Sequence, residues 1–279
     1  MNKFFAFCLM WSLLLCGCVP QDTPATQPTA VTTTVTTEAT TEATTEPTTE
    51  PTTEPTTEPT TEPTTEATTR PEHSPLYLPQ LDVEDVIRYF NEVCLNAEIV
   101  NAGDPTRLQK WVVPIRYYIN GTCTEKDKAT LDRFVSWLNQ IEGFPGMHIV
   151  DDPVVANLSI NFCGPEDYIA LMGENFHGTD GGVTFWYNGA DQIFDAIIGY
   201  RTDLSQEVRN SVILEEIYNG LGPINDTWER NTSIIYAGFS TPQWLSEEDQ
   251  LILKLLFHPT MKCGMNAAEC EAVIRQLYY

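Results

Sequence analysis

The chain has 279 residues, of which 39 are Asp or Glu and 15 are Lys or Arg, so its formal net charge at pH 7 is −24. An acidic excess of this size argues against nucleic-acid binding and favours a soluble protein outside the cell. No dinucleotide-binding, P-loop, nucleophile-elbow or EF-hand pattern occurs in the sequence, so those classes of site gain no support.

The first 18 residues are typical of an export signal. Lys3 precedes an apolar run from Phe4 to Leu15, and Leu-Cys-Gly-Cys at 15–18 resembles a lipobox, where bacterial lipoproteins are cleaved and acylated on cysteine. The run is shorter than the ~20 residues of a transmembrane helix. We predict that residues 1–18 are a lipoprotein signal peptide and that palmitate or another acyl chain on Cys18 anchors the protein to the extracellular face of the cell membrane. An ordinary secretory peptide cleaved nearby is the alternative.

Residues 19–75 have low complexity, with a glutamate at every fourth position from Glu38 to Glu66 among Thr and Pro. Such a segment has almost no apolar surface to bury, so it cannot offset the entropy lost on ordering. We therefore predict a disordered, extended stalk over residues 19–75. The remaining residues, 76–279, are enough for one domain with its own core.

Within this domain, apolar spacings of three and four residues predict helices, and short runs of β-branched and aromatic residues predict strands. The order of these elements indicates an α+β domain with one small mixed sheet and packed helices. The expected elements in chain order are helix 82–99, strand 110–119, helix 125–141, strands 147–150, 155–162, 181–188 and 195–200, and helices 205–221, 246–257 and 267–277.

The segment VILEEIYNGLGPINDT (212–227) places two adjacent carboxylates inside a helical run. Glu215 and Asn219 are four residues apart and therefore share one helix face, with Glu216 beside them. Gly222 is placed to end the helix, so the polar residues that follow it can fold back toward that face.

This spacing resembles the metzincin zinc site, H-E-x-x-H-x-x-G-x-x-H/D, in which three ligands hold zinc and the glutamate is the base. Glu216 occupies the base position, and Asn225, with Asp226 beside it, the third-ligand position. Glu215 and Asn219 replace both histidines. Carboxylate and amide oxygens suit calcium or magnesium better than zinc. We predict no resident metal and no cofactor.

Other segments resemble matrixins, a group of metzincins whose zinc helix has the pattern given above. SIIY (233–236) is similar to the Met-turn, with Ile235 at the methionine position. Segments 110–119, 134–144, 156–162 and 245–257 are similar to the first strand, the first catalytic-domain helix, the third strand and the start of the final helix. The resemblance implies a zincin-like, metzincin-type fold for residues 76–279.

The sequence also resembles the bacterial family called domain of unknown function 2927, whose members share EExxQxLGLxND, then SIF, LTxxD and LYxPxxxxGM. Departures here are Asn219 for glutamine, Pro223 for leucine and Ile235 for phenylalanine. The resemblance implies that the whole family lacks the histidines, and it brings no known activity. The matching residues are Glu215, Glu216, Leu221, Gly222, Asn225, Asp226, Ser233, Ile234, Leu245, Asp249, Pro259, Gly264 and Met265.

Three interpretations of this motif stay open. Glu215 and Glu216 could satisfy buried backbone and the following turn, as buried polar networks do. Alternatively, Glu216 could be the catalytic residue of a peptidase-like hydrolase with a non-standard metal or none. The third interpretation is a non-catalytic module that binds an extracellular peptide or glycan, with strand addition at Trp186 and Tyr187 on a predicted edge strand. The predicted binding residues are Glu215, Asn219, Asn225, Asp226, Trp186 and Tyr187.

Cysteine usage agrees with export, because disulfides form outside the cytosol. Five cysteines remain after processing, so at least one thiol stays unpaired in the monomer. We predict a Cys263–Cys270 disulfide that closes a short loop, with Cys123 and Cys163 as a second candidate pair.

Overall fold

The computed structural model describes residues 74–95 and 107–279. The predicted signal peptide (1–18) with Cys18, and the predicted stalk up to residue 73, lie outside the described residues. Across the two described ranges, no helix combines the length and the apolar character needed to cross a membrane.

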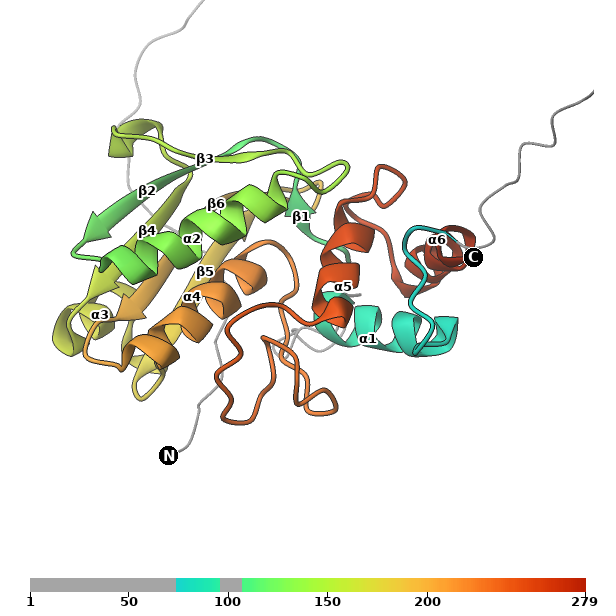
Figure 1. Ribbon diagram of the computed structural model, residues 1–279. Helices are drawn as coiled ribbons and strands as arrows, with labels where there is room; N and C mark the ends of the chain where they lie inside the picture. The colour runs from blue at the N-terminus through green and yellow to red at the C-terminus, as the bar shows by residue number, and fades with distance from the viewer. Residues whose placement is uncertain (1–73, 96–106) are drawn as a thin grey trace, which may run out of the picture. The chain divides into compact units, whose positions relative to one another are not determined.

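One mixed sheet of six strands, counted over the described residues, organises the domain (Figure 1). Neighbouring strands run parallel in the order β1-β6-β4-β2-β3, and β5 pairs antiparallel with β6. β3 and β5 therefore form the two edges. The strands are β1 Lys110–Trp111, β2 Ile115–Gly121, β3 Met147–Ile149, β4 Leu158–Cys163, β5 Gly181–Tyr187 and β6 Gln192–Arg201.

Helices α2 (Glu125–Leu138) and α4 (Gln206–Gly220) pack side by side on one face of the sheet (Figure 1). A buried ion pair joins them, because Arg209 donates to both carboxylate oxygens of Asp127. Gln206 Nε2 donates to the same carboxylate at 2.7 Å. This contact fixes the rotation and height of α4, the helix that carries the motif.

Helix α3 (Pro165–Met172) packs on the opposite face of the sheet. It contacts the sheet at Gly182 of β5 and Gly199 of β6, which are paired with each other. A Cβ on Gly182 would lie 2.4 Å from the Phe176 ring, and a Cβ on Gly199 would lie 2.8 Å from Met172 Cγ. The close approach of α3 thus requires both glycines. Two short 3-10 helices, η1 (Pro153–Val155) and η2 (Glu174–Phe176), complete this part of the chain.

The remaining helices, α1 (Val83–Leu95), α5 (Glu247–Phe257) and α6 (Ala267–Tyr278), lie together beside the sheet (Figure 1). The hydroxyl of Tyr278 accepts from Leu78 N–H and is 2.9 Å from the carbonyl oxygens of Leu78 and Leu81. The last helix thereby holds the segment through which the chain enters the domain.

The predicted α+β domain with a small mixed sheet and packed helices is confirmed. The predicted strand 110–119 is wrong in one respect: it is two strands, because Pro114 has no N–H for a sheet ladder. The sequence did not predict α3, which has only eight residues and starts at a proline after Gly164. Helix α1 ends at Leu95, and the rest of the predicted helix 82–99 lies outside the described residues.

Candidate functional site

The helix that carries the motif begins and ends as predicted. The Ser205 side chain accepts a hydrogen bond from the first turn, as an N-cap does. Gly222 follows the helix with φ +138°, and a Cβ there would lie 2.5 Å from the backbone oxygen of Gln109. The indole of Trp111 donates to Gly220 O at 2.9 Å and so binds a carbonyl of the last turn.

Glu216, the predicted catalytic residue, is buried, with an exposed fraction of 4%. Its side chain lies against the first residue of β5: a Cβ on Gly181 would be 3.0 Å from Glu216 Cγ and 3.1 Å from Oε1. Burial raises the pKa of Tyr200 and of Tyr168, and the Glu216 carboxylate raises both further. Glu216 is thus enclosed between α4 and the sheet, with little of its surface reachable by a substrate.

The two positions that replace histidine differ in burial. Asn219 is 5% exposed, whereas Glu215 is half-buried. Asn219 Oδ1 accepts no hydrogen bond from any described residue. A buried amide oxygen without a donor costs about 1–3 kcal/mol. The Oδ1 of Asn225 is buried without a donor in the same way, so both amide oxygens are suited to bind a water or another small donor.

The residues after the turn were predicted to fold back toward Glu215 and Asn219. The structure instead turns the side-chain amide of Asn225 toward α1, where Nδ2 donates to Glu92 O at 3.1 Å. The backbone N–H of Ile224 also donates to α1, at Val93 O, 2.7 Å away. The sequence predicted no role for α1 near the motif. In the structure, carbonyl oxygens of α1 accept hydrogen bonds from the chain that follows α4, including one from the Asn225 side chain. Asp226 is half-buried beside Asn225.

The donor set does not fit the zinc that the metzincin spacing implies. Within residues 74–95 and 107–279, no group of three or more His, Cys, Asp and Glu could hold a metal ion. The third-ligand position is Asn225, which offers a neutral amide oxygen where the metzincin pattern has histidine or aspartate. Zinc prefers imidazole and thiolate ligands, and this helix offers only oxygen donors.

A second polar cluster lies where α5 begins, and the sequence reasoning missed its partners. The carboxylate of Asp249 accepts hydrogen bonds from Tyr89 Oη (2.7 Å), Ser233 Oγ (2.7 Å), Ile234 N (3.0 Å) and Ser246 N (3.0 Å). These donors come from α1, from the turn at 233–236 and from the N-cap of α5. The cluster is internally satisfied, which is typical of a structural network.

The segment that resembles the Met-turn belongs to this structural network. Ile235, at the methionine position, has no exposed surface. Thr227 N donates to Ile235 O at 2.9 Å, and Ala237 N donates to Thr227 O at 2.9 Å. The chain after the motif thus closes back on itself.

The predicted binding aromatics, Trp186 and Tyr187, lie at the far end of β5, five and six residues from Gly181. At ~3.3 Å per residue they are about 17–20 Å along the strand from Gly181, where Glu216 packs. Trp186 is 37% exposed and Tyr187 is 36% exposed. A β-bulge separates them. Trp186 pairs across the ladder with Asp195, whose pKa is raised by partial burial. The structure thus separates the predicted site residues into two groups. A buried or half-buried group lies on α4 and in the turn after it, and an exposed group lies on β5.

All five cysteines of the domain are free thiols in the structure, so it lacks the predicted Cys263–Cys270 disulfide. Cys270 is fully buried on α6, where burial raises its pKa to about 12. The Cys263 thiol contacts Lys110 O at 3.6 Å. The short separation in sequence says nothing about the direction of each side chain, and these two thiols have different surroundings.

Comparisons with known proteins concern family and fold. None of the curated proteins that were compared matches this chain. Among solved structures, the chain is similar to the crystal structure of myroilysin, with 12% sequence identity and a TM-score of 0.26 over 62% of this chain and 72% of that one. The family described as "Protein of unknown function (DUF2927)" matches residues 83–276, which span nearly the whole predicted domain. The chain therefore belongs to the DUF2927 family, as the pattern around Glu215 and Glu216 predicts.

Proposed function

We propose that this domain is a non-catalytic module that binds an extended peptide along β5. The observation that carries the proposal is the exposed edge: β5 pairs with β6 and with no other described strand, and its far end exposes Trp186 and Tyr187. An edge strand offers unpaired backbone groups to a ligand, while neighbouring side chains supply affinity.

The surroundings of this edge support the same mode of binding. Phe194, the extra residue of the bulge on β6, is 48% exposed, and Val112 and Val113 after β1 are 43% and 42% exposed. β1 and β5 both pair with Ile193, so these side chains gather at one end of the sheet. Clustered exposed apolar side chains are typical of interaction sites. A glycan is the other ligand class that such aromatics could bind, and a strand edge that no described strand pairs with favours a peptide.

Replacing Trp186 and Tyr187 together with alanine is expected to weaken binding of extended peptides at least tenfold, because exposed aromatic anchors dominate such interfaces. Fluorescence anisotropy with terminally blocked octapeptide pools rich in Val, Thr and Tyr measures this on the full chain. Ile149→Ala is the matched control, since Ile149 is 52% exposed on β3, the opposite edge. Equal affinity of the double variant and the control would refute β5 as the site.

The alternative function is a peptidase-like hydrolase that uses Glu216. Its burial at 4% exposure favours a structural role. The same peptide pools distinguish the two, because Glu216→Gln should leave binding unchanged in the proposed module. Cleavage of the pools by the wild-type chain and its loss in Glu216→Gln would establish the hydrolase instead.

We also propose that the protein is a lipoprotein on the outer face of the cell membrane. The support is the sequence of residues 1–18 with Leu-Cys-Gly-Cys before the stalk. Cys18→Ala should abolish metabolic labelling with an alkynyl palmitate analogue and release the protein from the membrane fraction, while Cys16→Ala should change neither. Retained label in Cys18→Ala would show that another residue carries the lipid.

A further inference from the structure

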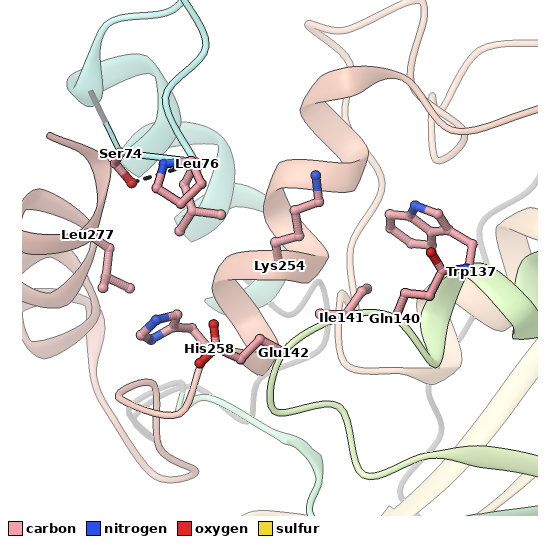
Figure 2. A pocket seen from close by; sticks show the side chains of 10 residues that line it. Ser74, Leu76, Trp137, Gln140, Ile141, Glu142, Lys254, His258 and Leu277 are labelled. Carbon is pink, nitrogen blue, oxygen red and sulfur yellow. Dashed lines mark hydrogen bonds between the residues drawn. The ribbon is translucent and has the colours of Figure 1, made fainter. Parts of the chain in front are cut away.

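A groove of about 540 Å³ lies beside α5 (Figure 2). Its lining includes no residue of the motif and neither Trp186 nor Tyr187. Helix α5 supplies Lys254 and its C-cap supplies His258. The end of α2 and the residues after it form one side, and residues 74–76 with α6 form the other. The residues that matter to its chemistry are Leu76, Trp137, Glu142, Lys254, His258 and Leu277.

The apolar side chains of this groove are held in place by the core. Leu76, Trp137 and Leu277 are partly buried and pack against the main hydrophobic cluster. The Trp137 ring stacks on Phe134 with centroids 6.1 Å apart and meets the edge of Trp244 at 6.2 Å. Side chains fixed in this way lose little entropy when a ligand binds.

Lys254 supplies a positive charge between these apolar sides. Figure 2 shows its ammonium group in the space between Leu76 and Trp137. In the part of the chain that the structure describes, no carboxylate lies within 4.0 Å of this ammonium, although Asp and Glu outnumber Lys and Arg by 39 to 15. An ammonium flanked by apolar groups interacts more strongly with an anion than one in bulk water.

His258 adds an imidazole ring on the Leu277 side of the groove (Figure 2). Its Nδ1 contacts Thr260 Oγ1 at 2.8 Å and the backbone N–H of Thr260 at 3.3 Å, which leaves Nε2 as the ring nitrogen for a ligand. Glu142, whose carboxylate lies beside the His258 ring in Figure 2, supplies an acceptor, and it is exposed to solvent. The groove therefore offers a cation, an imidazole nitrogen and a carboxylate around an apolar surface.

We infer that this groove binds an extended peptide in which an acidic side chain, paired with Lys254, is flanked by apolar residues that contact Leu76, Trp137 and Leu277. The Nε2 of His258 and the carboxylate of Glu142 supply hydrogen-bonding partners for a peptide backbone. The exposed rim at Glu142 lets the peptide continue beyond the groove. This site is separate from the β5 edge, and the inference does not depend on the proposed function.

The test compares two fluorescein-labelled, terminally blocked hexapeptide pools on the full chain by fluorescence anisotropy. Leu, Val, Pro and Phe are randomised around a fixed glutamate in one pool and around a fixed glutamine in the other. The wild-type chain should bind the glutamate pool at least fivefold more tightly, and Lys254→Gln should remove this preference, as expected for a charge-assisted contact. Lys254→Arg should retain the preference. Lys126→Gln removes the same charge from an exposed site on α2 and should change nothing.

Circular dichroism of each variant establishes that the fold is kept. The variant lacking Trp186 and Tyr187 should bind the glutamate pool as the wild type does, which separates this groove from the β5 edge. Equal binding of both pools, equal effects of Lys254→Gln and Lys126→Gln, or binding of uncharged oligosaccharides in place of the glutamate pool would overturn the inference.

Discussion

Asp127→Ala is expected to lower the free energy of unfolding by about 3–5 kcal/mol, the usual cost of removing one partner from a buried ion pair. The loss leaves Arg209, which is 8% exposed, without its carboxylate. The same carboxylate accepts from Gln206 and from Thr124 N–H, so α2 also loses part of its capping box. Urea unfolding of the full chain followed by tryptophan fluorescence measures the change.

Asp132→Ala is the matched control for this experiment, because it removes an exposed carboxylate from the same helix. Its expected effect is within about 0.5 kcal/mol. A second variant that replaces both Asp127 and Arg209 with apolar residues of similar size should recover part of the lost stability, since it leaves no buried charge behind. If Asp127→Ala lowered the free energy of unfolding no more than Asp132→Ala does, the Asp127–Arg209 ion pair would not stabilise the fold as proposed.

Asp249→Asn is expected to destabilise the domain by about 2–4 kcal/mol. The substitution keeps the size of the side chain but replaces one accepting oxygen by an amide that cannot accept from Ile234 N–H and Ser246 N–H. Each buried donor left without an acceptor costs about 1–3 kcal/mol. Thermal unfolding measured by circular dichroism should therefore show a clearly lower Tm.

Two further variants separate this network from a general charge effect. Tyr89→Phe removes one of the donors to Asp249 and should cost about 1 kcal/mol. Glu247→Gln neutralises an exposed carboxylate in the first turn of α5 and should cost less than about 0.5 kcal/mol. If Asp249→Asn lowered the stability no more than Glu247→Gln does, the hydrogen bonds of Asp249 would not stabilise the fold as proposed.

Much of the fold could be predicted because its signals are local. Ser205 and Ser246 are N-caps, as their positions before apolar runs predict. The end of α4 follows from Gly222, whose positive φ only glycine adopts easily. Where a local signal was overlooked, as at Pro114, the predicted boundary was wrong.

The candidate site was less predictable because its geometry depends on contacts between distant segments. The spacing from Glu215 to Asn219 places both on one helix face, but it does not say which neighbour covers that face. The burial of Glu216 follows from its approach to Gly181, 35 residues earlier in the chain. The hydrogen bond from Asn225 to Glu92 of α1 joins residues 133 apart in sequence, and no pattern in either segment predicts it.

The glycine pair beneath α3 also limits how sequences of this family can vary. A side chain at position 182 would meet the Phe176 ring and the Tyr168 hydroxyl, and one at position 199 would meet Met172 and Tyr168. A relative with alanine at either position must therefore carry smaller residues on α3 or η2, or shift that helix away from the sheet. The two glycines and the aromatic residues above them form one coupled unit, in which a change at one position requires a compensating change at another.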